Sequence, residues 1–432
     1  MPPLKRMYRI VSHLSLALTL LALLYPTMGE VTAQGEILLD DQFENNQNQW
    51  ESFGSVANIT LQDGVLQLQV DAENYVGSAL PAQSFPSDIL ITAEVRPQLT
   101  DPQNTNWSVS IITRVETRAV DSNMIEFGIE GTGEWVLRVS DNPDESTKAL
   151  LRGSLPEFDP SSPMKLGMAV SGDIFTLLYN DQVLAVSRER ILNTPAEIYA
   201  GVMVGTYEGL ASIAADFTRF TVSAVPEEMT HITPAEGGDE GVLFADDFQS
   251  NESGWAFAGW TGNALWEDGQ LILEVEGEDS YMMMTPEVLL PLKYVLEVTI
   301  RANNIGSEDT QWNAGVVVQS SARSKFGSWY QLDFEGDGGW TFSIHTTMGE
   351  TYDALKSGTI AGFSPAEAHV VRIEVQEGSF TYFVDGEQIG IFKDQALTLD
   401  PSGNFIGLVV GTFAGQEKIS VSFSKLSVTA LP

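Results

Sequence analysis

The chain has 432 residues and a formal net charge of −37, from 59 acidic and 22 basic residues. A protein this acidic repels nucleic acid and anionic membrane surfaces through its long-range field, so we expect neither as a partner. The absence of cysteine excludes a disulfide framework, and four unpaired histidines supply no zinc ligand set.

Residues 1–33 have the pattern of a signal peptide. Three basic residues precede an apolar run and a small-residue cleavage pattern, at Lys5, Arg6, Arg9, 14–24 and Val31-Thr32-Ala33. The apolar run falls short of the roughly 20 residues of a spanning helix. We therefore expect a secreted protein, extracellular or periplasmic, without membrane insertion after signal cleavage. If the signal is not cleaved, the chain remains membrane-anchored.

Three tryptophans recur 205 positions later, since Trp50, Trp107 and Trp135 correspond to Trp255, Trp312 and Trp340. A period of this length belongs to a whole domain rather than to a solenoid unit, so it predicts two copies of one domain. The copies span 35–225 and 241–432. Residues 226–240 are rich in proline, glycine and acid, which predicts an extended linker and two domains that move independently or dock weakly.

Within each copy the apolar residues alternate with polar ones. Residues 65–70 and 270–275, each after an Asp-Gly turn, have this period of two, and similar short runs fill both copies. No window of comparable length has a helical period. We therefore predict an all-β fold of two tandem antiparallel β-sandwich (jelly-roll) domains.

One hairpin of the second copy carries a candidate binding surface. Tyr330, Leu332 and Phe334 share its core face, which leaves Trp329, Gln331 and Asp333 on the outer face. A flat ring beside polar side chains suits a sugar, although Trp329 could equally pack under a loop. Tryptophans found only in the second copy extend the predicted ligand-binding set, which is Trp329, Gln331, Asp333, Trp260 and Trp266. If this surface binds, the second copy recognises the ligand and the first is more a spacer.

Several segments resemble the concanavalin A-like lectin/glucanase superfamily, and in particular laminin-G-like modules and the 3-keto-disaccharide hydrolase family. The segments are Asp246-Asp247-Phe248, 329–334, 372–386 and 406–411. The resemblance implies a jelly roll of two curved sheets whose concave face or rim loops often bind sugars. It implies no particular chemistry, because the fold serves enzymes and binders alike.

Catalytic residues are poorly supplied. Retaining glucanases of the superfamily carry Glu-x-Asp-x-x-Glu on one strand, and neither copy has that motif. Asp333 and Glu335 are the weak candidates, because carboxylates at i and i+2 share a strand face. Gly128 takes the place of Asp333 in the first copy, so the pair is not duplicated, and a solvated or calcium-linked strand end is the simpler explanation.

Calcium is the one cofactor that the residues support. Paired aspartates open both copies, and the candidate ligands are Asp41 and Asp247. An acidic strand start is also an ordinary solubilising edge, so the alternative is no cofactor.

We therefore predict a secreted protein that binds a glycan or a cell-surface polymer and has no clear catalytic site. One alternative is a glycoside hydrolase of the keto-disaccharide hydrolase or glucanase type. The other is a structural or adhesive cell-surface module.

Overall fold

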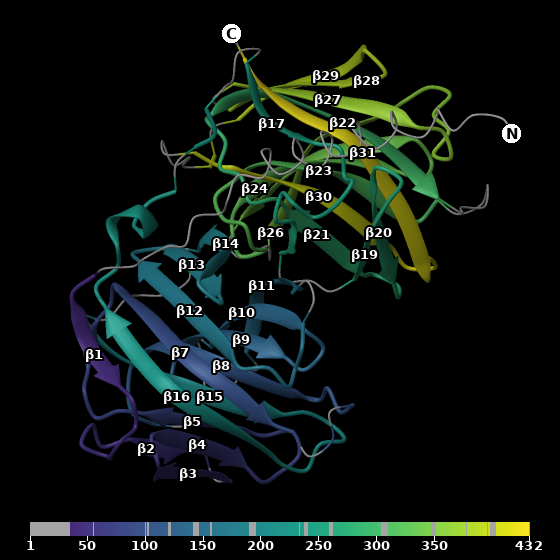
Figure 1. Cartoon of the computed structure of the whole chain (residues 1–432). Helices are drawn as coiled ribbons and strands as arrows, with labels where there is room; N and C mark the ends of the chain where they lie inside the picture. The colour runs from purple at the N-terminus through teal and green to yellow at the C-terminus, as the bar shows by residue number, and fades with distance from the viewer. Residues whose placement is uncertain are drawn as a thin grey trace, which may run out of the picture.

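The computed structural model describes residues 35–431 except 55, 100, 102, 120–121, 141–146, 156–157, 190–195, 233, 237–240, 259–261, 304–309, 347–350, 377, 395 and 398–402. The predicted signal peptide and Trp260 lie outside the described residues. We call 35–225 the first half and 241–431 the second half (Figure 1). The described residues form antiparallel sheets and one short 3-10 helix, η1 (Glu227–Met229). The predicted all-β sandwich fold is confirmed.

Each half has an eight-stranded sheet with the same strand order. In the first half the order is β14 (Gln182–Arg188), β13 (Ile174–Tyr179), β12 (Met164–Ser171), β7 (Ile89–Gln98), β16 (Ile213–Ser223), β4 (Val65–Val70) and β3 (Ala57–Gln62), with β1 (Ile37–Asp41) beside β16. In the second half it is β29 (Glu387–Lys393), β28 (Ser379–Val384), β27 (His369–Gln376), β22 (Lys293–Asn303), β31 (Lys418–Ala430), β20 (Gln270–Glu276) and β19 (Asn263–Glu267), with β17 (Val242–Asp246) beside β31.

The opposing layers of the two halves join into one 15-stranded sheet. The first half contributes β2 (Glu51–Phe53), β5 (Val76–Leu80), β15 (Glu197–Thr206), β8 (Trp107–Val115), β9 (Met124–Glu130), β10 (Glu134–Ser140) and β11 (Lys148–Ser154), with β6 (Phe85–Pro86) beside β15. The second half continues with β18 (Ala256–Phe257), β21 (Tyr281–Thr285), β30 (Phe405–Thr412), β23 (Trp312–Ser320), β24 (Trp329–Glu335), β25 (Gly339–Thr346) and β26 (Thr351–Thr359).

The same turn opens both halves. Asp41 accepts hydrogen bonds from the Phe43 amide at 2.8 Å and from the Trp50 indole at 2.8 Å. In the second half, Asp246 accepts them from the Phe248 amide and the Trp255 indole, each at 2.7 Å. The acidic strand start is therefore an acceptor that pins a buried tryptophan into the core, because an indole N–H removed from water needs a partner.

The two halves are joined more closely than the linker composition predicts. Arg152 of β11 pairs with Phe257 of β18, which makes the large sheet continuous. The linker is also packed, since Met229 is buried against the first half and the Ala235 amide donates to the Leu289 carbonyl at 2.7 Å. The expectation of independent or weakly docked domains is wrong, because backbone pairing and buried side chains cross the junction.

The shared sheet turns opposite sides to solvent in its two halves. Arg152 pairs with Val136, which points away from the first core, while its other partner Phe257 packs against the second core. Paired residues lie on the same side of a sheet. The outward side of the first half therefore continues as the core side of the second, so the two outward faces do not form one groove.

Candidate functional site

The predicted residues of β24 lie together on the outward face of the second half. The Trp329 indole donates to Gln331 Oε1 at 3.1 Å, and Gln331 Nε2 donates to Asp333 Oδ2 at 2.6 Å. Tyr281 of β21 donates its hydroxyl to the same Gln331 oxygen at 2.6 Å. Alternation along one strand and pairing with its neighbours thus produce a hydrogen-bonded chain that ends at the Asp333 carboxyl group.

This chain is covered rather than open. Trp329 is 0% exposed, Gln331 1% and Asp333 4%. The Trp329 ring packs among Ala258, Met283 and neighbouring aliphatic side chains and stacks on His345, with ring centroids 4.7 Å apart. Trp329 therefore offers no exposed ring for a sugar in this structure, because neighbouring strands bury it.

An exposed aromatic residue that the sequence reasoning missed stands at the edge of the face. Tyr352 of β26 is 51% exposed and packs edge-on against His345, with centroids 5.2 Å apart. Three rings therefore run outward from Trp329 through His345 to Tyr352. Register is the signal that could have found them, since Trp329, His345 and Tyr352 occupy successive paired positions on β24, β25 and β26.

Several buried polar atoms of this face have no hydrogen-bond partner among the residues that the structure describes. They belong to three neighbouring strands and include Asn313 Oδ1 on β23, Asp333 Oδ1 on β24 and His345 Nε2 on β25. A buried polar atom without a partner costs about 1 to 3 kcal/mol, so folded proteins seldom keep several together without a use.

Burial also shifts the titration of this face. Desolvation, with a smaller contribution from the Glu335 charge, raises the pKa of Asp333 to about 7, against the opposing Gln331 hydrogen bond. Burial lowers the pKa of His345 to about 4, so its ring is neutral at pH 7. A carboxyl group with a pKa near 7 can give or take a proton under ordinary conditions.

The other predicted residues are used differently. Glu335 shares the face, and its carboxylate accepts from the Thr341 hydroxyl at 3.4 Å. Trp266 lies on β19 of the eight-stranded sheet and packs against the second core, so the structure does not bring it to Trp329. The two tryptophans belong to different sheets, and a role of Trp266 in ligand binding stays a prediction.

The calcium candidates have structural partners. Both Asp41 oxygens accept hydrogen bonds from protein donors, and one Asp247 oxygen accepts from the Gln249 amide at 3.1 Å. By contacts the counterpart of Asp41 is Asp246 rather than Asp247. No group of three or more acidic or histidine side chains suited to a metal occurs in the part of the chain that the structure describes.

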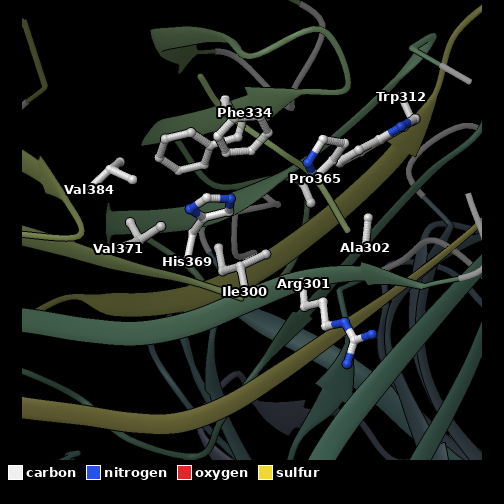
Figure 2. Close-up of a pocket in the computed structure, with 11 residues that line it drawn as sticks. Ile300, Arg301, Ala302, Trp312, Phe334, Pro365, His369, Val371 and Val384 are labelled. Carbon is white, nitrogen blue, oxygen red and sulfur yellow. The ribbon is translucent and has the colours of Figure 1, made fainter. Parts of the chain in front are cut away.

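A cavity between the two sheets of the second half is too small for a sugar. It measures about 20 Å³, and Figure 2 shows Phe334, Trp312 and His369 around it with the Arg301 guanidinium turned away. That volume holds about one water molecule. The ring of His369 is held by the Asp385 carboxylate at 2.7 Å and the Ser364 carbonyl at 2.9 Å, so it serves the framework.

Comparison with known proteins agrees with this architecture. Residues 242–428 match the family model described as the 3-keto-alpha-glucoside-1,2-lyase-like domain. The second half is therefore similar to this family, which confirms the predicted resemblance. No curated protein matches the chain.

Solved structures also match parts of the chain. A carbohydrate-binding module, CBM66 from Bacillus subtilis, is 11% identical over 41% of this chain and 96% of its own, with a TM-score of 0.33. A lichenase from a mouse hindgut metagenome is 15% identical over 43% of this chain and 99% of its own, with a TM-score of 0.33. The Bacillus licheniformis β-glucanase is 16% identical over 45% of this chain and 100% of its own, with a TM-score of 0.34.

Among the described residues, no helix is both long and apolar enough to cross a bilayer.

Proposed function

We propose that the outward face of β23 to β26 binds a carbohydrate. The observation that carries this proposal is the group of buried polar atoms without partners on Asn313, Asp333 and His345. A sugar hydroxyl both donates and accepts, so the hydroxyls of a glycan chain that extends along these strands can supply donors to the two oxygens and a partner of either kind to the imidazole nitrogen. The family match over the second half supports the same ligand class.

Tyr352 is the ring that meets the sugar in this proposal. It is 51% exposed, and it lies near enough to Asp333 for that carboxylate's charge to raise the pKa of the Tyr352 hydroxyl, after burial as the larger cause. Because the polar atoms are covered, binding requires side chains of this face to move, and the Tyr352 ring then packs on the apolar face of the sugar.

The test is retention on a panel of immobilised soluble polysaccharides, including β-glucan, dextran and fructan, at pH 7. We expect Tyr352→Ala to weaken retention about tenfold or more, as loss of a stacking contact of about 1.5 kcal/mol predicts. Exposed Tyr75 of the first half provides the matched control, since it is 48% exposed and lies away from this face. Equal retention of wild type, Tyr352→Ala and Tyr75→Ala removes the proposed site.

Acid–base chemistry at Asp333 is the second candidate function. A pKa of about 7 and a carboxyl oxygen that lacks a partner within the described ranges favour it. In a 3-keto α-glucoside, the substrate in the family's description, the ketone acidifies the C2 proton. Asp333 would take that proton while the C1–O bond breaks and the aglycone leaves with a proton from solvent. If Asp333→Asn forms no product but still binds the sugar, the result would support catalysis by Asp333. Unchanged product formation would exclude Asp333 as the base.

Export of the protein and its glycan or cell-surface polymer partner also remain proposals. They are supported by the 1–33 pattern and by the family match. N-terminal sequencing of protein recovered outside the cytoplasm checks the first, with a start near residue 34 expected.

A further inference from the structure

The segment between β23 and β24, residues 321–328, joins the two halves immediately before the candidate site. We call it the junction segment. Arg323 within it is fully buried. Its guanidinium donates to the Val186 carbonyl of the first half at 2.8 Å, and to the Gly254 and Thr285 carbonyls of the second half at 2.7 and 3.2 Å. One side chain thus ties together three backbone positions across the junction.

Ser324 makes a second bond across the junction. Its hydroxyl donates to Glu189 Oε2 of the first half at 2.6 Å, while Ser187 donates to the other carboxyl oxygen at 2.5 Å. Glu189 is 1% exposed, and Ser324 is 0% exposed. Burial raises the pKa of Glu189 to about 7, opposed by both hydroxyls and by the Arg323 charge. Each oxygen of this buried carboxyl group therefore has a donor, and one donor comes from the other half.

Apolar contacts reinforce these bonds. Phe326 packs against the core of the first half, and Ala256 of β18 belongs to that same core cluster. The Lys325 amide donates to the Ala258 carbonyl at 2.9 Å. The junction segment is therefore seated on the first half by the Phe326 side chain and on Ala258, the residue after β18, by its backbone.

The junction segment leads directly into the strand that carries the site. It closes on itself through the Ser321 amide, which donates to the Ser328 carbonyl at 3.0 Å, and the Ser328 amide, which donates to the Ser321 hydroxyl at 2.9 Å. Trp329 is the next residue and packs against Ala258. A displacement of the junction segment therefore moves the start of β24.

The first half contains a matched arginine whose partners all lie in its own half. Arg118 stands 205 positions before Arg323 and donates to the Gln49 and Leu80 carbonyls at 3.1 and 3.4 Å, the counterparts of Gly254 and Thr285. Its remaining partner is Glu51 of its own half at 3.0 Å, and its side chain is 22% exposed. The arginine at this position thus contacts only its own half in the first copy, whereas in the second copy it contacts both halves.

We propose that Arg323, Ser324 and Glu189 are positioning residues for the carbohydrate site, through which the first half holds β24 and its Trp329, Gln331 and Asp333 in register. This inference rests on the proposed function for its binding consequence. Its structural part, that the first half fixes the start of β24, stands without a ligand.

The experiment measures the junction and the site separately. Because the chain has no cysteine, dyes can be placed at Gln47→Cys and Glu387→Cys, one exposed position in each half, to report separation of the halves. Hydrogen exchange of the 329–335 amides reports the order of β24, and polysaccharide retention reports binding. The variants are Arg323→Lys and the control Arg118→Lys in the full chain.

For Arg323→Lys we expect a broadened dye distance, exchange of the 329–335 amides faster by about tenfold to a hundredfold, and weaker retention, since charge-assisted hydrogen bonds are lost. Arg118→Lys should leave all three unchanged. Ser324→Ala should shift exchange in the same direction by less, and Ser324→Thr, which keeps the hydroxyl, should restore it. If Arg323→Lys fails to fold, the two Ser324 variants test the same positioning role with a smaller change to the buried junction.

Separated halves with unchanged exchange of the 329–335 amides would overturn the inference, because the junction would then merely join the halves. An unchanged dye distance in Arg323→Lys would overturn it as well. If the wild-type chain binds no polysaccharide while Arg323→Lys still loosens β24, the proposed function fails and the positioning role survives.

Discussion

The outward faces of the two halves differ in how their polar side chains are paired. On β9 and β10 of the first half, Arg138 donates to both Glu126 and Glu130, and Ser110 donates to Glu126 at 2.6 Å. Burial lowers the pKa of Arg138, but the charges of Glu126, Tyr207 and Glu130 outweigh it and raise that pKa overall. The first face is therefore closed by its own ion pairs.

On the second face the arginine is missing. Ser343 takes its place 205 positions later, and Gln331 takes the place of Glu126, while Asp333 adds a carboxyl group where the first half has Gly128. Without a cation, Asp333 keeps one oxygen unpaired within the described structure and its pKa rises. The comparison teaches that one framework can either satisfy its buried polar atoms internally or leave them for a ligand.

The apolar end of each face differs too. Met124 occupies the position of Trp329, and with Phe53, Ile112 and Met203 it lines a shallow pocket of about 30 Å³ on the first half. In the second half the larger Trp329 ring fills that space. The first face thus has a small apolar pocket beside satisfied charges, and the second has a filled pocket beside unsatisfied ones.

The largest effect is expected from breaking the ion pairs of the first face. Arg138→Ala leaves the Glu126 and Glu130 carboxylates close together and largely buried, which should lower the free energy of unfolding of the first half by about 3 to 5 kcal/mol. Urea unfolding at pH 7 measures it. The matching change Ser343→Ala should lower the free energy of unfolding by under about 1 kcal/mol. Equal losses in the two variants would contradict the idea that ion pairs close only the first face.

Asp333→Asn tests the second face through pH. The pKa of Asp333 is raised from 3.8 to about 7, so its contribution to stability is complete below pH 3.8 and is lost as pH rises through 7. The asparagine variant has no such loss and should exceed wild type at pH 8 by up to about 4 kcal/mol, at 1.36 kcal/mol per pKa unit.

Unfolding midpoints in urea at pH 4 and pH 8 measure this effect. The two proteins should differ by less than about 1 kcal/mol at pH 4, because Asp333 is then neutral in the folded protein and only partly ionised in the unfolded one. Glu335→Gln is the control on the same strand and should change the pH dependence less, since Glu335 is only partly buried. If the unfolding stabilities of wild type and Asp333→Asn change in parallel with pH, the pKa of Asp333 is not raised, which would contradict its burial without a countercharge.

The smallest effect concerns the aspartates that open the two halves. Asp41→Ala removes the acceptor of the Trp50 indole and should destabilise by about 1 to 3 kcal/mol, and Asp246→Ala should match it through Trp255. Asp247→Ala should stay within about 0.5 kcal/mol. A calcium chelator should leave the melting temperature of wild type unchanged. A lower melting temperature on chelation would instead support a bound calcium ion at these residues.

The fold could be predicted because its signals are local. Alternation at 65–70 and 270–275 became β4 and β20, and the outward position of Trp329, Gln331 and Asp333 followed from the period of two. Sequence reasoning left open whether Trp329 is exposed or packed, and it could not foresee that Tyr352 is exposed. Those properties depend on which strands flank β24 and on how far each neighbouring side chain reaches across the sheet.

The sequence alone therefore determined the all-β architecture, the correspondence between Trp50 and Trp255, and the polar side of β24, because periodicity and residue type act within a few residues. Only the tertiary structure decided that Arg323 bridges the halves while Arg118 does not, and that Trp266 and Trp329 lie on different sheets. The physical reason is that strand pairing and burial are set by residues far apart in the chain, whose meeting no local pattern records.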